Sequence, residues 1–167
     1  MTLRKMLYLS LLLSGGLVMG LLELNIPMPI VIPGAKIGIS NIIVLVSIVF
    51  FGYKEGIFVA VLKTLLLVLL TGSVSSFIFS FTGTMFSTFV MIAAHRFLSE
   101  HLSIIGISIL GAVFHNVGQT LAAAVVLESM HIVAYLPFLM IFAIFTGIFI
   151  GFSSREVVKI LNKVYKE

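Results

Sequence analysis

Long uncharged apolar stretches, separated by short polar or charged segments, dominate the chain. The first stretch, 6–22, would as a helix be about 26 Å long, close to the roughly 30 Å of a bilayer's hydrocarbon core. The uncharged stretch 64–94 is too long for one helix, and its polar cluster at 71–76 predicts a break. The pattern predicts six transmembrane helices, at 6–22, 37–53, 56–71, 77–94, 104–127 and 132–154.

Composition supports a membrane protein. Hydrophobic residues make up 60% of the 167 residues and charged residues only 10%, whereas a soluble domain of this length needs more polar surface. We therefore expect an all-α integral membrane protein that forms a single transmembrane domain over 1–167. The absence of cysteine excludes a disulfide framework and thiolate metal sites.

The basic residues predict the orientation. Of the lysines and arginines in the predicted connections, only Lys36 falls on one side; the other side holds Arg4, Lys5, Lys54, Arg96, Arg155, Lys159, Lys163 and Lys166. Because basic residues accumulate on the cytoplasmic side, both termini are expected in the cytoplasm of a prokaryotic cell, beneath its inner or plasma membrane. The net charge of +4 forms no exposed run or stripe, so nucleic acid is not an expected partner.

The connection 23–36 is apolar but contains three prolines, at 27, 29 and 33, so it cannot be a regular helix. Non-helical backbone facing lipid would leave its polar groups unsatisfied. We expect this segment to fold over the outer ends of the helices. It would then be either the wall or lid of an outward-facing pocket, or an ordinary ordered loop.

Lys63 lies halfway along the predicted third span. A lysine at the bilayer centre costs about 3 kcal/mol on insertion scales, so it needs a partner or a water-filled cavity. Binding of a ligand, a structural hydrogen bond, and extension of the side chain toward an interface are the three explanations.

Other polar residues gather at the membrane midplane or outside it. In the predicted fifth span, spacings of one and four residues place His115, Asn116 and Gln119 on one helix face. This asymmetry indicates a binding site open to the exterior, although His115 and Asn116 could instead join helices by hydrogen bonds. The candidate substrate-binding residues are Lys63, His115, Asn116, Gln119, Asn41, Lys36 and Glu23.

Small residues recur at four-residue spacing, which lets helices approach closely. The pattern occurs at Ser10 and Ser14 and again at 16/20 and 147/151. Most such patterns serve internal packing. On the first span, Ser10 and Ser14 are candidates for a face that docks another membrane subunit.

Residues for catalysis are missing. The chain has no G-x-x-x-x-G-K-[ST] loop for ATP and no Asp to hold Mg²⁺ against a diphosphate. We expect no catalytic residues, no metal site, no cofactor and no enzymatic activity.

Two motifs, Pro33-Gly-Ala-Lys-Ile-Gly-Ile-Ser-Asn41 and His115-Asn-Val-Gly-Gln119, together with Leu-Leu-Glu23, resemble the Gx transporter family, labelled heptaprenyl diphosphate synthase component I. The resemblance runs from the first predicted span through the sixth. That family in turn is similar to the substrate-binding S components of energy-coupling-factor transporters, which have six helices, cytoplasmic termini and an outward binding site.

This resemblance implies a partner complex of one transmembrane coupling protein and two ATPase subunits. In S components an Ala-x-x-x-Ala stripe on the first helix faces the coupling protein, and here Ser10 and Ser14 stand in the similar place. The substrate would be a small, partly hydrophobic molecule, such as a vitamin or a quinone or isoprenoid precursor. The synthase label implies an alternative, a non-catalytic membrane subunit assisting prenyl diphosphate or quinone synthesis. A proton-coupled carrier using Lys63 and His115 is a third class, which the lack of visible paired repeats disfavours.

Overall fold

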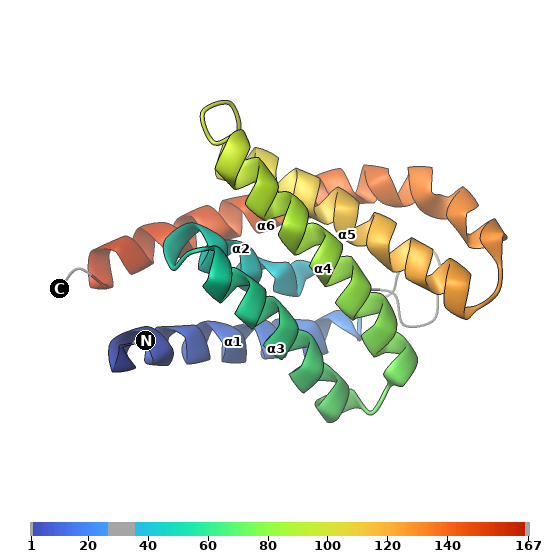
Figure 1. Cartoon of the computed structure of the whole chain (residues 1–167), viewed down its shortest axis with the longest axis horizontal. Helices are drawn as coiled ribbons and strands as arrows, with labels where there is room; N and C mark the ends of the chain where they lie inside the picture. Colours follow the sequence, from blue (N-terminus) through green and yellow to red (C-terminus); the bar gives the residue numbers. More distant parts are fainter. Residues whose placement is uncertain (1, 27–35, 166–167) are drawn as a thin grey trace.

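The computed structural model describes residues 2–26 and 36–165, and this part of the chain is almost entirely helical (Figure 1). The α-helices are α1 (Leu3–Glu23), α2 (Ile42–Phe50), α3 (Tyr53–Thr71), α4 (Val74–Phe97), α5 (Ile104–Val126) and α6 (Leu136–Val164). Two 3₁₀ helices, η1 (Ile39–Asn41) and η2 (Met130–Tyr135), precede α2 and α6. No strand occurs within the described residues, so the predicted all-α class is confirmed.

Within the described chain, four helical segments are long and apolar enough to cross a membrane, which supports a membrane protein. They are Leu3–Glu23, Val74–Phe97, Ile104–Val126 and Met130–Val164. The predicted break at 71–76 is confirmed. Gly72, with φ +68°, follows the end of α3, and the Ser73 side chain caps α4 by accepting a hydrogen bond from the Ser76 backbone N–H.

The predicted second span, 37–53, is wrong in its length. Only nine residues, Ile42–Phe50, form α2, and a helix of that length is about 14 Å long, too short to cross the bilayer alone. Gly38 before it and Gly52 after it both have positive φ, which interrupts the helix on both sides. α3 is long enough to cross the bilayer at 19 residues, but its two lysines and one glutamate exclude it from the four apolar segments named above.

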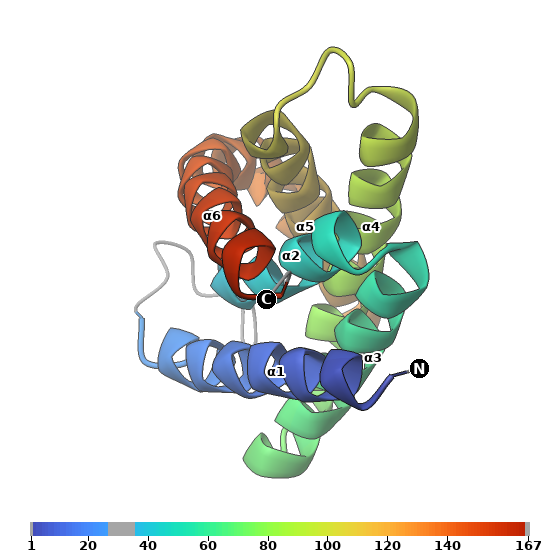
Figure 2. The ribbon, with the colours of Figure 1, turned by 90° about the vertical axis from the view of Figure 1, so that its left-hand side faces the viewer.

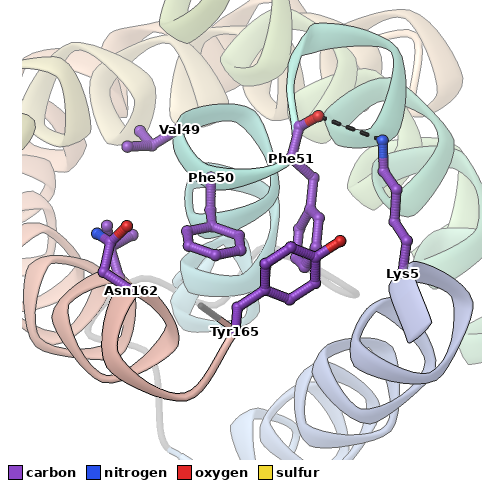
Figure 3. A pocket seen from close by; sticks show the side chains of 7 residues that line it. Lys5, Val49, Phe50, Phe51, Asn162 and Tyr165 are labelled. Atoms are coloured by element: carbon purple, nitrogen blue, oxygen red, sulfur yellow. Dashed lines mark hydrogen bonds between the residues drawn. The ribbon is translucent and has the colours of Figure 1, made fainter. Parts of the chain in front are cut away.

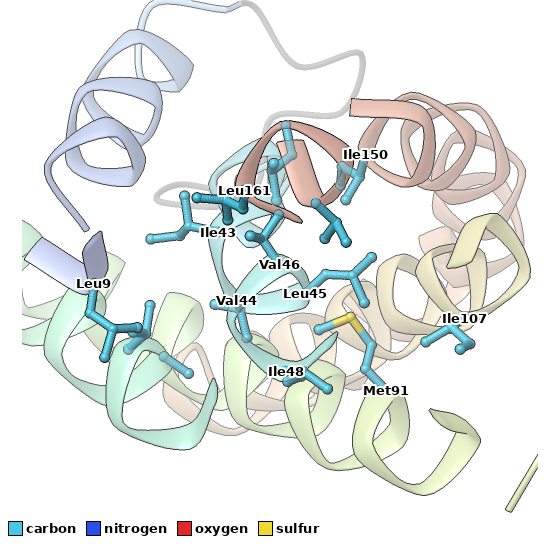
Figure 4. Close-up of a cluster of buried hydrophobic side chains, with 14 of the residues drawn as sticks. Leu9, Ile43, Val44, Leu45, Val46, Ile48, Met91, Ile107, Ile150 and Leu161 are labelled. Carbon is cyan, nitrogen blue, oxygen red and sulfur yellow. The ribbon is translucent and has the colours of Figure 1, made fainter. Parts of the chain in front are cut away.

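α2 is the centre of the bundle. Every residue from 42 to 48 is buried, and Figure 2 shows α2 enclosed by the longer helices. Its side chains pack with apolar residues of the surrounding helices, among them Leu9, Met91, Ile107, Ile150 and Leu161 (Figure 4). A short helix that is apolar on all sides is stable here because it meets protein in every direction.

α1 packs more loosely. Only Leu9, Gly16, Gly20 and Glu23 of this helix are buried, so most of its surface is free to face lipid or another protein. Gly16 fits against Ile43, and Gly20 against Leu67. These two glycines therefore serve internal packing.

The two ends of the described chain lie at the same end of the bundle (Figures 1 and 2). The Arg4 guanidinium donates to the backbone carbonyl of Val164 over 3.0 Å, and the rings of Tyr8 and Tyr165 meet edge to face. α6 continues beyond the predicted span 132–154, as an extension that carries Lys159 and Lys163. The cytoplasmic location of both termini stays a prediction from the basic residues.

We expect labelling in intact cells to follow that prediction. Cysteines introduced near Lys54, Arg96 or Lys163 should be shielded from an impermeant thiol reagent, and cysteines near Asn25 or Ser75 should react. The native chain has no cysteine, so the background is clean. Labelling near Lys163 from outside would refute the orientation.

Candidate functional site

Lys63 is 1% exposed and is held inside the protein by η1. Its ammonium donates to Oδ1 of Asn41 over 2.7 Å and to Oγ of Ser40 over 3.2 Å. Lys63 comes from the middle of α3, whereas Ser40 and Asn41 come from η1. The lysine thus has structural partners, and Ser40 is a member of the site that sequence reasoning did not name, although it precedes Asn41 directly.

Asn41 connects Lys63 to His115 of α5. Because an ammonium can only donate, it fixes the Asn41 amide with the oxygen toward Lys63. The Asn41 amide nitrogen then faces Nδ1 of His115 at 3.2 Å and donates to it. The other ring nitrogen, Nε2, is buried and has no hydrogen-bond partner within the described residues.

Two glycines make room for the His115 ring. A Cβ atom on Gly38 would lie 3.1 Å from the ring, and one on Gly83 of α4 would lie 2.8 Å from the His115 carbonyl oxygen. Gly38 also has φ +89°, a conformation that other residues rarely adopt. The sequence reasoning did not name these glycines as part of the site.

Glu23, the last residue of α1, is 4% exposed and binds the backbone next to η1. Its Oε1 accepts hydrogen bonds from the backbone N–H groups of Gly38 and Ile39. Its Oε2 is buried and has no hydrogen-bond partner among the described residues. Lys63 and Lys36 both interact electrostatically with the carboxyl group, and among the described residues neither forms an ion pair with it.

Gln119 fixes the chain at Lys36. Its Oε1 accepts from the Lys36 backbone N–H over 2.8 Å, and its Nε2 donates to the Lys36 carbonyl over 3.0 Å. Burial lowers the pKa of the Lys36 ammonium, and the nearby carboxyl of Glu23 acts in the opposite direction. Gln119 therefore attaches the end of the connection between α1 and η1 to α5.

Asn116 does not join this cluster. Its amide donates to the backbone carbonyl of Leu139 over 2.9 Å, which links α5 to α6. His115 and Gln119 bind η1 and the chain before it, whereas Asn116 makes this contact with α6, and its role in substrate binding stays a prediction. The structure brings together Lys63, Asn41, His115, Glu23, Lys36 and Gln119, and places Asn116 in a helix contact.

Ser10 and Ser14 lie on the exposed side of α1. Each hydroxyl donates to a carbonyl one turn earlier in its own helix, at 2.9 Å. Both hydroxyls are therefore satisfied within α1, and the short serine side chains project little from the surface of the helix. Of the predicted proline-rich wall, 27–35 lies outside the described residues.

A cavity of about 440 Å³ lies at the end of the bundle that carries the termini (Figure 3). Lys5 contributes to its wall and contacts both the Phe51 carbonyl at 3.5 Å and the Glu55 carboxylate at 2.5 Å. Sequence reasoning used Lys5 only for orientation, because nothing in the spacing connects it to a glutamate on another helix.

No group of three or more potential metal ligands occurs in the described part of the chain.

Comparison with known proteins gives one family. A family model described as heptaprenyl diphosphate synthase component I matches residues 12–157, which includes every predicted site residue except Ser10. No curated protein and no solved structure matches the chain.

Proposed function

The chain belongs to the heptaprenyl diphosphate synthase component I family, and we propose that it acts as the substrate-binding S component of an energy-coupling-factor type uptake transporter. The observation that carries this proposal is the buried polar cluster. Glu23, Lys36, Asn41, Lys63 and His115 gather inside the protein, where α1, η1, α3 and α5 meet. Buried polar clusters in membrane proteins are costly, and they are concentrated at sites of function.

In this role the protein binds and does not catalyse. Lys36 and Lys63 supply positive charge, and Asn41 and His115 supply amide and imidazole groups for a small, partly hydrophobic substrate. Energy would come from two ATPase subunits acting through a transmembrane coupling protein. The chain itself needs no cofactor for this role.

The family description favours a second candidate, a non-catalytic membrane subunit that assists prenyl diphosphate or quinone synthesis. Such a subunit would hold an apolar substrate or product at the membrane for a soluble enzyme. The two candidates share the binding of a small molecule and differ in the protein partner.

Native mass spectrometry of the purified protein tests the small-molecule binding that both candidate functions require. We expect a retained small molecule of defined mass that is absent from an unrelated membrane protein purified from the same cells. Recovery of the protein with only phospholipid and detergent bound would count against substrate binding.

We expect the α1 face to dock the coupling protein. Replacing Ser10 and Ser14 together by Leu should abolish copurification of that partner, because the bulkier side chains prevent close helix approach. The isolated protein should stay folded, since both serines are exposed and bonded only within α1.

Replacing the same two serines by Ala is the matched control. Alanine is also small, so it still allows close helix approach, and it removes only hydroxyl groups that bond within their own helix. The Ala variant should copurify the partner as the native protein does. Full copurification with the Leu variant would remove this face from the proposal.

A further inference from the structure

The cavity of about 440 Å³ at the end of the bundle that carries the termini shares no lining residue with the buried polar cluster (Figure 3). Its volume lies within the range of about 300–1,000 Å³ typical of small-molecule sites. Residues of α1, of α6 and of the end of α2 form its wall. Those labelled in Figure 3 are Lys5, Val49, Phe50, Phe51, Asn162 and Tyr165.

One side of this cavity is apolar and aromatic. The centroid of the Tyr165 ring lies 5.3 Å from that of Phe50 and 5.8 Å from that of Phe51, and the rings meet edge to face. Val49 and Val158 extend this wall. Such a wall favours the apolar part of an amphiphile, whereas a small hydrated ion would gain little from it.

The other side presents hydrogen-bond donors. An ammonium has three, and Lys5 uses two of them, toward the Glu55 carboxylate at 2.5 Å and the Phe51 carbonyl at 3.5 Å. The Asn162 amide and the Tyr165 hydroxyl form no hydrogen bond with any described residue. The Glu55 carboxylate would repel an anion, but it is paired with Lys5 and is not among the lining residues. Three side chains therefore hold donors free for an anionic oxygen.

The charge around the cavity is positive. Arg4, Lys54 and Lys163 lie in the terminal turns of α1, α3 and α6 at this end of the bundle, and none of them has an ion-pair partner among the described residues. The Arg4 guanidinium lies 5.1 Å from the centroid of the Tyr165 ring, beside the cavity. Each basic residue near a membrane surface attracts anionic lipid by about 1 kcal/mol.

The cavity also lies at the level where the apolar stretches of two helices end. On α1, Arg4 and Lys5 precede an uncharged stretch that reaches Leu22, and on α6 the uncharged stretch from Leu136 ends before Arg155. In a bilayer the headgroups occupy this level. Basic pockets between transmembrane helices on the cytoplasmic side bind anionic lipid headgroups in other membrane proteins.

We propose that this cavity binds the phosphate of an anionic phospholipid, held by Lys5, Asn162 and Tyr165, with the apolar part of the lipid against Phe50 and Phe51. The bound lipid joins the N-terminal end of α1 to the end of α6. The proposal goes beyond the transport role and does not depend on it, because the buried polar cluster takes no part.

Native mass spectrometry of the purified, delipidated full chain in detergent tests the proposal. The chain is titrated with phosphatidylglycerol and, separately, with phosphatidylcholine of the same acyl chains, and the dissociation constant of the first bound lipid is measured. We expect phosphatidylglycerol to bind about tenfold more tightly, because the choline group of the other lipid opposes the surrounding positive charge. Equal affinities would overturn the proposal.

Two substitutions locate the lipid. Lys5→Met removes the charged donor, whereas Asn162→Leu removes the amide and fills part of the cavity without touching the ion pair between Lys5 and Glu55. Each should weaken phosphatidylglycerol binding about tenfold, the effect of losing one hydrogen bond to a charged group. Unchanged affinity in Asn162→Leu would show that the lipid lies outside the cavity.

Lys163→Met is the matched control. It removes the same charge from the same end of the bundle, and Lys163 is exposed and is not among the lining residues. The affinity should change less than about twofold. An equal loss in Lys163→Met and Lys5→Met would show that diffuse charge attracts the lipid and would overturn the site.

Soluble glycerol 3-phosphate distinguishes a lipid from a free phosphate compound. It carries a glycerol-linked phosphate without hydrocarbon chains, so an excess should leave the bound phosphatidylglycerol in place. Displacement of the lipid by this excess would overturn the assignment to a lipid and identify a soluble phosphate compound as the ligand.

Discussion

Replacing Lys63 by Met should destabilise the ligand-free protein by about 2–3 kcal/mol, because Oδ1 of Asn41 and Oγ of Ser40 lose their shared donor while buried. The opposing effect is the membrane cost of a central lysine, about 3 kcal/mol. That cost applies to an unpaired lysine facing lipid. Here the ammonium is already paired inside protein, so we expect the lost hydrogen bonds to dominate. The melting temperature in detergent or nanodiscs measures the outcome.

Lys54→Met is the matched control. Lys54 lies on the same helix and is exposed, so removing its charge should change stability by less than about 0.5 kcal/mol. A melting temperature of the Lys63→Met variant at or above that of the native protein would contradict the structural role. Affinity for a retained ligand, measured on the same variant, then reports whether Lys63 also contacts substrate.

The second large effect is expected at the contact between α5 and α6. A Cβ atom on Gly147 would lie 2.6 Å from Cα of Ile109, and one on Gly151 would lie 2.6 Å from Cα of Ile105. Both obstacles are backbone atoms, which cannot rotate away as a side chain can. Gly147→Ala should therefore destabilise the protein by about 2–3 kcal/mol, by forcing the helices apart.

Gly15→Ala provides the comparison for this substitution. In the part of the chain that the structure describes, no atom outside the backbone of α1 lies within 4 Å of a Cβ atom at Gly15, so the better helix propensity of Ala should leave stability unchanged or raise it by up to about 1 kcal/mol. The melting temperature of Gly147→Ala should fall below that of the native protein, and that of Gly15→Ala should equal or exceed it. Equal melting temperatures for the two variants would show that α5 and α6 are not in close contact at this position.

The helices were predictable where apolar length and a polar break coincide. The positions of α4 and α5 and the break at 71–76 follow directly from the sequence pattern. The short α2 could not be predicted, because its apolar stretch continues past both ends of the helix. The interruptions come from the positive φ angles at Gly38 and Gly52, and a glycine in a sequence permits such a conformation without requiring it.

The residue types of the site could be predicted from the sequence, but the contacts between them could not. A lysine in mid-span needs a partner or a water-filled cavity, and the sequence left a ligand, a structural hydrogen bond and extension toward an interface as explanations. The actual partners, Ser40 and Asn41, depend on a turn before α2 that no periodicity encodes. Similarly, Asn116 and His115 are adjacent in the chain, yet the packing of α6 decides that Asn116 binds Leu139.

Copurification is the decisive test of the proposal that this chain binds substrate for an energy-coupling complex. A tagged chain expressed at native level is extracted from its own membranes in mild detergent, and the bound proteins are identified by mass spectrometry. We expect one transmembrane coupling protein and two ATPase subunits to be recovered with it. Recovery of a soluble prenyltransferase without any ATPase subunit would contradict it and would favour a membrane subunit of prenyl diphosphate synthesis.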